Sequence, residues 1–318
     1  MIGVIGAGAF GTALAVTLGR EGRPVTLWAR DATHVQAMAE ARQNTARLPG
    51  IRFPPSLTVT ADLGDLAGIE TVLLALPMQM LGTFLQAHGA VLTRRTLVAC
   101  CKGVDLNTLR GPSALIAAAC PDATPAILTG PSFAADIGQG LPTALTIAVA
   151  TGGEALQRQL STATLRIYRS SDVVGAELGG ALKNVYAIAA GVVVGAGLGS
   201  SARAALMTRG YAEMQRFAIA MGARAETLAG LSGLGDLVLT CTSPQSRNLR
   251  YGMALGAGQG FDAGVTVEGV ATAQAVTRMA RALTVEMPIA DTVAALVARR
   301  VPLDDAIRGL MSRPLKAE

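Results

Sequence analysis

Several residue types that build common functional sites are scarce in this sequence. Aromatic residues make up 3% of the 318 residues and charged residues 15%, and the chain has two histidines and one tryptophan. Its four cysteines form no Cys-x-x-Cys pair, which argues against a zinc site; they are Cys100, Cys101, Cys120 and Cys241. We expect no bound metal, and reduced thiols as in a cytoplasmic protein.

Clusters of basic residues are also missing. The formal net charge is +5 and the isoelectric point about 9.3, but lysines and arginines are spread along the chain and aromatic residues do not interleave with them. This distribution argues against nucleic-acid binding. The surplus charge either lies on solvated surface or gathers at one site for a small anionic substrate.

One uncharged segment, residues 185–202, is about long enough to span a bilayer. It holds Gly191, Gly195 and Gly199, a spacing that favours helix dimerisation in lipid. Its glycines and serines leave it only moderately apolar, and no aromatic belt flanks it. We therefore expect a helix buried in a protein core and no stable membrane insertion. Met1 leads into an apolar run without a basic leader, so no secretory signal is expected.

Small and aliphatic residues dominate what is present. Hydrophobic residues make up 51% of the chain, which is ample for one large or two ordinary cores and excludes disorder. Apolar runs predict strands at 2–5, 25–28, 71–76, 96–100, 126–129, 144–149 and 165–168. Their alternation with helical stretches predicts an open, mostly parallel sheet. Beyond about residue 172, patterns predict helices at 175–194, 201–222, 225–231, 246–256, 270–282 and 289–299.

A glycine motif joins the first predicted strand to the first helix. Gly6, Gly8 and Gly11 have the Gly-x-Gly-x-x-Gly spacing, which permits a tight turn, close approach of a pyrophosphate and close helix–strand packing. The motif directly follows a strand inside a βαβ unit, which makes it a specific signal. The expected fold class is therefore α/β. An N-terminal Rossmann-type, doubly wound, mostly parallel sheet binds a dinucleotide (1–172), and an all-helical domain binds substrate and carries catalysis (173–318).

The residue after the second strand indicates the cofactor. NAD sites usually have an acidic residue there, whereas Arg30 suits the 2′-phosphate of NADP. The neighbouring Asp31 would serve NAD. NADP is preferred, and NAD stays open.

Polar residues also follow two later strands. Lys102 lies after the strand at 96–100, and Gly130-Pro131-Ser132-Phe133 lies after the strand at 126–129. Ligands of open parallel sheets bind at the carboxyl ends of strands, so Lys102 and Ser132 are candidates for substrate binding. Alternatively, Lys102 is a surface lysine and Ser132 caps the next helix.

The predicted helical domain contains its own polar groups. Lys183 stands beside Asn184 in an apolar helix, where a charge is costly unless it is paired and where burial moves a lysine pKa toward the range useful for proton transfer. Asp236 is a possible partner for it or for a substrate hydroxyl. In Ser246-Arg247-Asn248 the guanidinium suits a phosphate and the amide suits hydroxyls. Glu268 could bind a cofactor hydroxyl.

Taken together, the motifs resemble bacterial NAD(P)-dependent glycerol-3-phosphate dehydrogenases over nearly the whole length. The matching blocks are 6–15, 48–51, 57–63, 102–103, 130–134, 179–184, 233–237 and 246–248. One block alone is moderately specific, whereas all of them in this order are highly specific.

The resemblance implies reduction of dihydroxyacetone phosphate by NAD(P)H to sn-glycerol 3-phosphate, for phospholipid synthesis. It implies that Lys183 is the catalytic acid/base. The residues implied to surround the substrate are Lys102, Gly130, Ser132, Asp236, Ser246, Arg247 and Asn248. Those implied to contact the cofactor are Ala9, Phe10, Arg30, Ala134, Val267 and Glu268, with Lys102 and Arg247 near both ligands. Asp136 stands where the family often has Glu, and Ala9 where Ser is common.

Three other functions stay open. A related β-hydroxyacid or ketopantoate-type reductase would usually space its Lys and Asn several residues apart, whereas Lys183 and Asn184 are adjacent. A non-catalytic nucleotide sensor would need neither Lys183 nor Arg247, and a membrane-anchored protein would use 185–202. A homodimer through the helical domain is possible, and the sequence leaves the oligomeric state open.

Overall fold

The chain folds into two compact units, as a computed structural model that describes residues 1–311 shows. The first unit comprises residues 1–102 and 111–173. The second comprises 103–110 and, of the described residues, 174–311. The segment 103–110 therefore belongs to the second unit although the chain on both sides of it belongs to the first, which nothing in the sequence indicated.

Within residues 1–311, eight strands form one sheet in the order β3-β2-β1-β4-β5-β6-β7-β8. All neighbouring strands are parallel except β6 and β7, which confirms a mostly parallel sheet. The strands are β1 (Ile2–Ile5), β2 (Val25–Trp28), β3 (Leu57–Thr60), β4 (Thr71–Leu74), β5 (Thr96–Ala99), β6 (Thr124–Thr129), β7 (Thr143–Ala148) and β8 (Leu165–Ser170).

The strand β3, which lies at an edge of the sheet and pairs with β2, was not predicted. Only its first and last residues, Leu57 and Thr60, are buried, so it shows no apolar run. By contrast, β1, β2 and β4 are buried at every position and were found from sequence.

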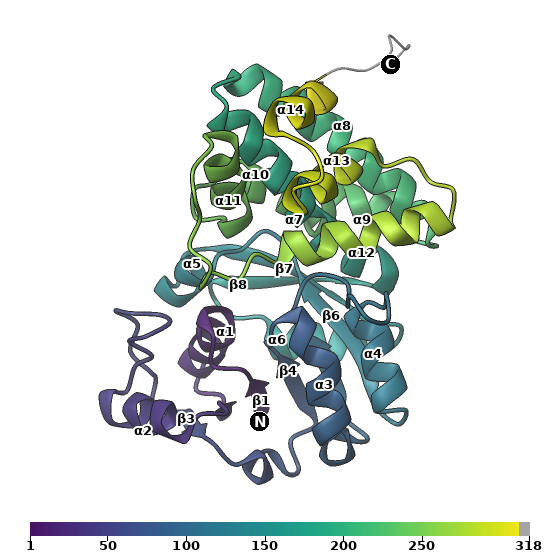
Figure 1. Ribbon diagram of the computed structural model, residues 1–318. Helices are drawn as coiled ribbons and strands as arrows, with labels where there is room; N and C mark the ends of the chain where they lie inside the picture. The colour runs from purple at the N-terminus through teal and green to yellow at the C-terminus, as the bar shows by residue number, and fades with distance from the viewer. Residues whose placement is uncertain (312–318) are drawn as a thin grey trace. The chain divides into compact units, whose positions relative to one another are not determined.

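Helices of the first unit cover the sheet in two sets. Helix α1 packs against α5, and α3 packs against α4 (Figure 1). The helices are α1 (Ala9–Arg20), α2 (Ala32–Ala41), α3 (Met78–His88), α4 (Pro112–Ala119), α5 (Ala134–Gln139) and α6 (Gly153–Leu160), with short 3-10 turns at Leu63–Leu66 and Gly89–Leu92. Their buried side chains are mainly Leu, Ile, Val and Ala, as the scarcity of aromatic residues requires.

The described part of the second unit is helical. Its elements are α7 (Val173–Gly195), α8 (Gly199–Ala220), α9 (Ala225–Ala229), a π-helical turn (Leu231–Gly235), α10 (Asp236–Thr242), α11 (Arg247–Gly256), α12 (Glu268–Ala282), α13 (Pro288–Val297) and α14 (Leu303–Met311). Helices α10 and α14 were not predicted as separate helices.

Within residues 1–311, α7 is the one helix long and apolar enough to cross a membrane, judged by length and composition alone. However, 89% of its most apolar window is buried inside the protein, as expected for a core helix. The uncharged run 185–202 is not one helix. Helix α7 ends at Gly195 and helix α8 begins at Gly199. The chain turns between them because Gly197 and Gly199 adopt positive φ angles of 73° and 86°.

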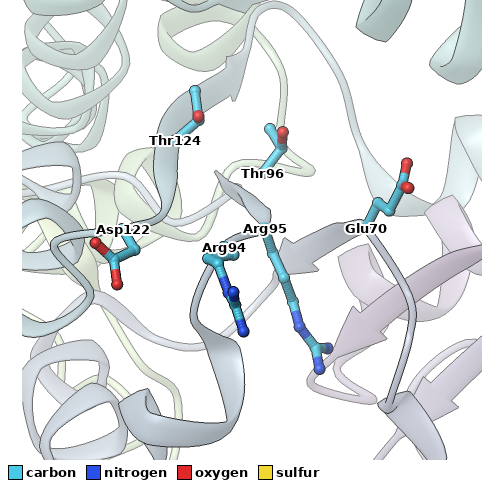
Figure 2. A pocket seen from close by; sticks show the side chains of 6 residues that line it. All are labelled: Glu70, Arg94, Arg95, Thr96, Asp122 and Thr124. Atoms are coloured by element: carbon cyan, nitrogen blue, oxygen red, sulfur yellow. The ribbon is translucent and has the colours of Figure 1, made fainter.

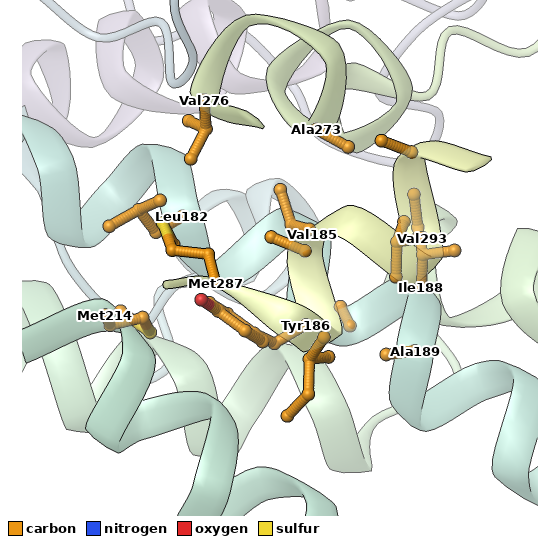
Figure 3. Packing of buried hydrophobic residues seen from close by; sticks show 14 of the residues in the cluster. Leu182, Val185, Tyr186, Ile188, Ala189, Met214, Ala273, Val276, Met287 and Val293 are labelled. Atoms are coloured by element: carbon orange, nitrogen blue, oxygen red, sulfur yellow. The ribbon is translucent and has the colours of Figure 1, made fainter. Parts of the chain in front are cut away.

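Side chains of α7 form the centre of the second core. Tyr186 is fully buried, and Figure 3 shows methionine, valine and alanine side chains packed around it. Its hydroxyl donates to Glu213 at 3.4 Å. Glu213 is also fully buried and accepts from the backbone N–H of Ile289 at 2.9 Å, so its carboxylate caps the N-terminus of α13. These hydrogen bonds account for the burial of Glu213, so no catalytic role is needed to explain it.

Helices α7 and α11 meet at backbone contact distance. A Cβ atom added to Gly191 would lie 2.2 Å from the carbonyl oxygen of Leu249, and one added to Gly252 would lie 2.1 Å from that of Ile188. Gly195 and Gly256 make the same kind of approach one turn further on. The small-residue pattern of α7 therefore serves packing inside one chain.

Candidate active site

The glycine motif lies where the strand order of the sheet reverses. Strand β1 pairs with β2 on one side and with β4 on the other, and open α/β sheets bind ligands at such a point. Gly6 has φ of 110°, and a Cβ there would lie 2.6 Å from the carbonyl oxygen of Ala75. A Cβ on Gly11 would lie 2.1 Å from the carbonyl oxygen of Gly6. Both positions therefore require glycine.

The middle glycine fits a pyrophosphate. Gly8 is exposed, and a Cβ added to it would meet nothing within 4 Å, so this side of the loop is open. Gly8 is the N-cap of α1, and no side chain caps the helix. Its first N–H groups, beginning with Ala9 and Phe10, are thus available to an anion. The loop is suited to a dinucleotide.

After β2, Arg30 is exposed and Asp31 is the N-cap of α2. The Asp31 carboxylate accepts from the N–H groups of Thr33 at 2.9 Å and His34 at 3.3 Å. Asp31, the acidic side chain that would serve NAD, therefore caps α2 through Oδ1.

Lys102 and Ser132 meet at one carbonyl group beyond the ends of β5 and β6. Lys102 Nζ donates to the Gly130 oxygen at 3.2 Å, and Ser132 Oγ donates to the same oxygen at 3.4 Å. Gly130 has φ of 136°, where a side chain would be strained. Ser132 is not a helix cap, because the N-cap of α5 is Phe133 and Ala134 is its first residue.

In the second unit, Lys183 is buried in an ion pair. Its Nζ lies 2.5 Å from Asp236 Oδ1 and donates to Thr240 Oγ1 at 2.7 Å, and Thr240 lies 3.3 Å from the same carboxylate oxygen. Lys183 is 7% exposed and Asp236 0%. Of the two partners that the sequence left open for Asp236, Lys183 or a substrate hydroxyl, the structure shows Lys183.

Local backbone structure positions this pair. Asp236 and Thr240 lie one turn apart on α10 and so share a face. The π-helical turn before α10 approaches α7 closely, since a Cβ on Gly179 would lie 2.4 Å from the Ser232 carbonyl oxygen. The lack of a side chain at Gly179 thus lets the turn before Asp236 lie close to the helix that carries Lys183.

A second buried network lies next to the pair. Asn248 Nδ2 donates to Asn184 Oδ1 at 2.9 Å, and Asn248 Oδ1 accepts from the N–H of Gly269 at 3.0 Å. These bonds join α7, α11 and the first turn of α12, where Val267 is the N-cap and Glu268 the first residue. The network therefore holds three predicted site segments together.

At the start of α11, Ser246 and Arg247 have different environments. Ser246 is buried and caps the helix, accepting from the N–H of Leu249 at 3.2 Å. Arg247 is the first residue of the helix and is exposed. A guanidinium beside uncommitted first-turn N–H groups is suited to a phosphate.

Cys241, next to Thr240 on α10, is fully buried. Burial raises the pKa of its thiol from 9.0 to about 12, with Lys183 opposing the rise and Asp236 adding to it. Burial likewise raises the pKa of Cys100 to about 12. Both thiols are neutral at physiological pH and are poor nucleophiles.

Sequence profiles of one family match both parts of the chain. The NAD-dependent glycerol-3-phosphate dehydrogenase N-terminus matches residues 1–155, and the C-terminus of the same enzyme matches residues 172–308. The chain belongs to the NAD-dependent glycerol-3-phosphate dehydrogenase family.

Relatives in this glycerol-3-phosphate dehydrogenase family match along their whole length. A Cereibacter sphaeroides protein named glycerol-3-phosphate dehydrogenase (NAD(P)+) is 67% identical, with 100% of each chain covered. The crystal structure of glycerol-3-phosphate dehydrogenase from Coxiella burnetii is 35% identical and has a TM-score of 0.93, with 98% of each chain covered. A ketopantoate reductase from Ralstonia eutropha reaches a TM-score of 0.63 at 18% identity over 96% of this chain, a likeness of fold alone. The family assignment therefore does not favour the ketopantoate-type alternative.

Two residues of these networks were missed by sequence reasoning. Thr240 lies 57 positions from Lys183 in the sequence. Asn44 lies 37 positions from Ala7 of the glycine loop, and its Nδ2 donates to the Ala7 carbonyl oxygen. Threonine and asparagine are common in turns and helices, so neither stands out without the tertiary contact.

A hollow of about 350 Å³ lies at the amino ends of β5 and β6, at the end of the sheet opposite the glycine loop. Figure 2 shows the side chains that line it. It is lined by both signs of charge, including Arg94, Arg95, Glu70 and Asp122. None of these is a predicted site residue. In the part of the chain that the structure describes, no group of three or more His, Cys, Asp or Glu is placed to hold a metal ion.

Proposed function

We propose that the protein interconverts dihydroxyacetone phosphate and sn-glycerol 3-phosphate with NADP(H) or NAD(H). The observation that carries this proposal is the buried Lys183 ammonium, held by Asp236 and Thr240 in a chain of this family. The first unit would bind the dinucleotide and the second the substrate. These units differ from the expected domains 1–172 and 173–318 mainly in residues 103–110, which belong to the second unit. The product would supply phospholipid synthesis.

Lys183 is the proposed acid/base. A bound nicotinamide supplies or accepts the hydride. In the reductive direction, Lys183 Nζ donates a proton to the substrate oxygen as negative charge develops on it. Asp236 and Thr240 fix the position of the Nζ atom, which keeps it oriented for proton transfer to the substrate oxygen.

We assign substrate binding to a set of polar residues. Arg247, with the N–H groups of the first turn of α11, would hold the phosphate, and Asn248 would bind a hydroxyl. The other proposed substrate residues are Lys102, Gly130, Ser132, Asp236 and Ser246. Binding energy from the phosphate, which does not react, would orient the ketone.

Cofactor binding is assigned to the glycine loop and to Arg30. Gly6, Gly8 and Gly11 shape the loop, and Ala9 and Phe10 present helix N–H groups. NADP is the preferred cofactor because Arg30 is exposed while Asp31 caps α2. Further contacts are proposed for Lys102, Ala134, Arg247, Val267 and Glu268.

The proposed partner is one small phosphorylated molecule, with no nucleic acid and no membrane insertion. The four free cysteines support a cytoplasmic location. A homodimer is one of the oligomeric states that the sequence leaves open.

The test is NADPH oxidation with dihydroxyacetone phosphate by the wild type, Lys183→Ala and Arg247→Ala. We expect the wild type to turn over and Lys183→Ala to lose kcat by at least about 10²-fold, the size of one general acid. Arg247→Ala should raise KM for dihydroxyacetone phosphate and leave kcat with unphosphorylated dihydroxyacetone unchanged. A wild type that binds NADPH and NADH but reduces neither substrate would overturn the proposed reaction and favour the nucleotide sensor.

A further inference from the structure

A buried side chain outside the predicted site contacts the glycine loop. Asn44 lies after α2 and is 0% exposed. Its Nδ2 donates to the carbonyl oxygen of Ala7 at 2.9 Å and to Thr12 Oγ1 at 2.8 Å. Its Oδ1 accepts from the N–H of Arg47 at 3.2 Å. The carboxamide therefore links residues far apart in sequence to both ends of the loop.

The segment that carries Asn44 is fixed independently. The N–H of Leu48 donates to the Asn44 carbonyl oxygen at 2.8 Å, and the N–H of Phe53 donates to the Arg42 carbonyl oxygen at 2.8 Å. Leu48 and Phe53 are buried in the first core. The backbone around Asn44 is thus held by bonds and packing that do not involve the glycine loop.

One of its bonds sets the direction of a peptide group. In a trans peptide the C=O and the following N–H point in opposite directions. The Ala7 carbonyl points toward Asn44, so the N–H of Gly8 points away from it. A Cβ added to Gly8 would meet nothing within 4 Å, so the backbone is open there to a pyrophosphate, which approaches this glycine closely in the motif.

We propose that Asn44 is a positioning residue for dinucleotide binding, which holds the Ala7–Gly8 peptide so that the loop N–H groups face the pyrophosphate. This inference rests on the proposed function only for the assignment of a dinucleotide. Thr12 receives the second amide N–H, which joins the same support to the first turn of α1. A carboxylate at position 44 could not donate to Ala7 and would repel its carbonyl oxygen.

The test compares Asn44→Asp with Gln43→Glu. Both replace a carboxamide by a carboxylate and add the same charge, but the Gln43 side chain is only half-buried and its backbone pairs with Arg52. The affinities for NADPH and for adenosine 2′-phosphate, which lacks the pyrophosphate, are measured by calorimetry in the absence of substrate. Energy transfer from Trp28, the only tryptophan, gives a second measure of NADPH binding. If the wild type binds NADH more tightly than NADPH, then NADH is used in place of NADPH, and adenosine in place of adenosine 2′-phosphate.

We expect Asn44→Asp to raise the Kd for NADPH at least tenfold and to leave the Kd for adenosine 2′-phosphate within twofold. At saturating NADPH, kcat should stay within threefold, and Gln43→Glu should stay within twofold in both affinities. Equal weakening of the two ligands, equal weakening by Gln43→Glu, or no change in NADPH affinity would overturn the inference.

Folding is checked separately. Asn44→Ala replaces Asn44→Asp if the latter loses the far-UV spectrum of the wild type, and loss of fold by both variants would make Asn44 purely structural and overturn the inference. A wild type that binds NADPH but does not reduce dihydroxyacetone phosphate would overturn the proposed reaction and leave the Asn44 test intact. A wild type that binds no dinucleotide would overturn both.

Discussion

At the scale of single residues, Thr240 supplies a neutral contact to a buried charge. Its hydroxyl accepts from Lys183 Nζ at 2.7 Å and lies 3.3 Å from Asp236 Oδ1. A hydrogen bond to a charged group contributes about 1.5–3 kcal/mol, and a buried ammonium has few other partners. Thr240 therefore limits the positions that Nζ can adopt beside the substrate.

We predict that Thr240→Val lowers kcat about tenfold, which corresponds to about 1.4 kcal/mol. The shape of valine is almost that of threonine, so packing is kept and only the hydroxyl is lost. Thr240→Ser keeps the hydroxyl and should stay within threefold of the wild type. Steady-state kinetics with dihydroxyacetone phosphate measure this, and equal losses in the two variants would show that the methyl group matters instead.

A second residue-scale prediction concerns Cys241. Its folded-state pKa of about 12 exceeds its ordinary value of 9.0. Above pH 9 the unfolded thiol ionises while the folded one stays protonated, so its contribution to stability falls as pH rises toward 12. The stability advantage of the wild type over Cys241→Ala should shrink by about 2 kcal/mol between pH 8.0 and pH 10.5. Urea unfolding followed by far-UV circular dichroism tests this; a constant difference at the two pH values would contradict it.

The residue scale also shows what the sequence could reveal of the site. Charged residues in apolar surroundings stand out, so Lys183 and Asp236 were singled out, with their pairing as one of two possibilities. Arg30 was singled out by its place after a strand. Thr240 and Asn44 were missed because their importance comes from a contact across 57 and 37 positions, which no local pattern encodes.

At the scale of elements, the packing of α7 on α11 is set by glycines on both helices. The carbonyl oxygens of Ile188 and Leu249 each occupy the space where a Cβ of the facing glycine would lie. Because Asn184 and Asn248 lie on these same two helices, the distance between the helices also sets the bond between the two amides. Packing and site geometry are therefore coupled here.

We predict that Gly252→Ala lowers the free energy of unfolding by about 2 kcal/mol, although alanine is the better helix former. Its Cβ would lie 2.1 Å from the Ile188 carbonyl oxygen, so the helices must separate. KM for dihydroxyacetone phosphate should rise with it, as Asn248 moves. Gly260→Ala is the matched control, since its Cβ meets nothing within 4 Å, and it should stay within about 0.5 kcal/mol. An unchanged free energy of unfolding in Gly252→Ala would contradict the close approach of α7 and α11 at this position.

Helices and strands were predicted correctly where the sequence has a strong apolar run or a strong helical spacing of apolar residues. Strands buried on both faces, such as β1 and β4, have continuous apolar runs, and α7 and α8 have long helical patterns. The edge strand β3 and the short helix α10 lack such a signal, since their form depends on the neighbours they pair with or pack on. The reversed direction of β7 relative to β6 also left no mark in the sequence, because a buried strand reads the same in either direction.

At the scale of the whole molecule, the net charge of +5 acts on charged ligands at a distance. Dihydroxyacetone phosphate is an anion, whereas dihydroxyacetone is neutral. A surplus of positive charge speeds the encounter with an anion, and salt screens this effect because the Debye length falls from about 30 Å at 0.01 M to about 10 Å at 0.1 M. The modest and dispersed charge of this chain can therefore favour its substrate without a basic patch.

We predict that kcat/KM for dihydroxyacetone phosphate falls at least threefold between 0.01 M and 0.1 M NaCl, at saturating NADPH. The same parameter for dihydroxyacetone should change less than 1.5-fold, because a neutral ligand gains nothing from the field. A parallel fall for both substrates would place the salt effect on the fold or on proton transfer from Lys183. Arg247→Ala should reduce the salt dependence for the phosphorylated substrate only in part, since the remaining positive charge of the molecule still attracts the anion.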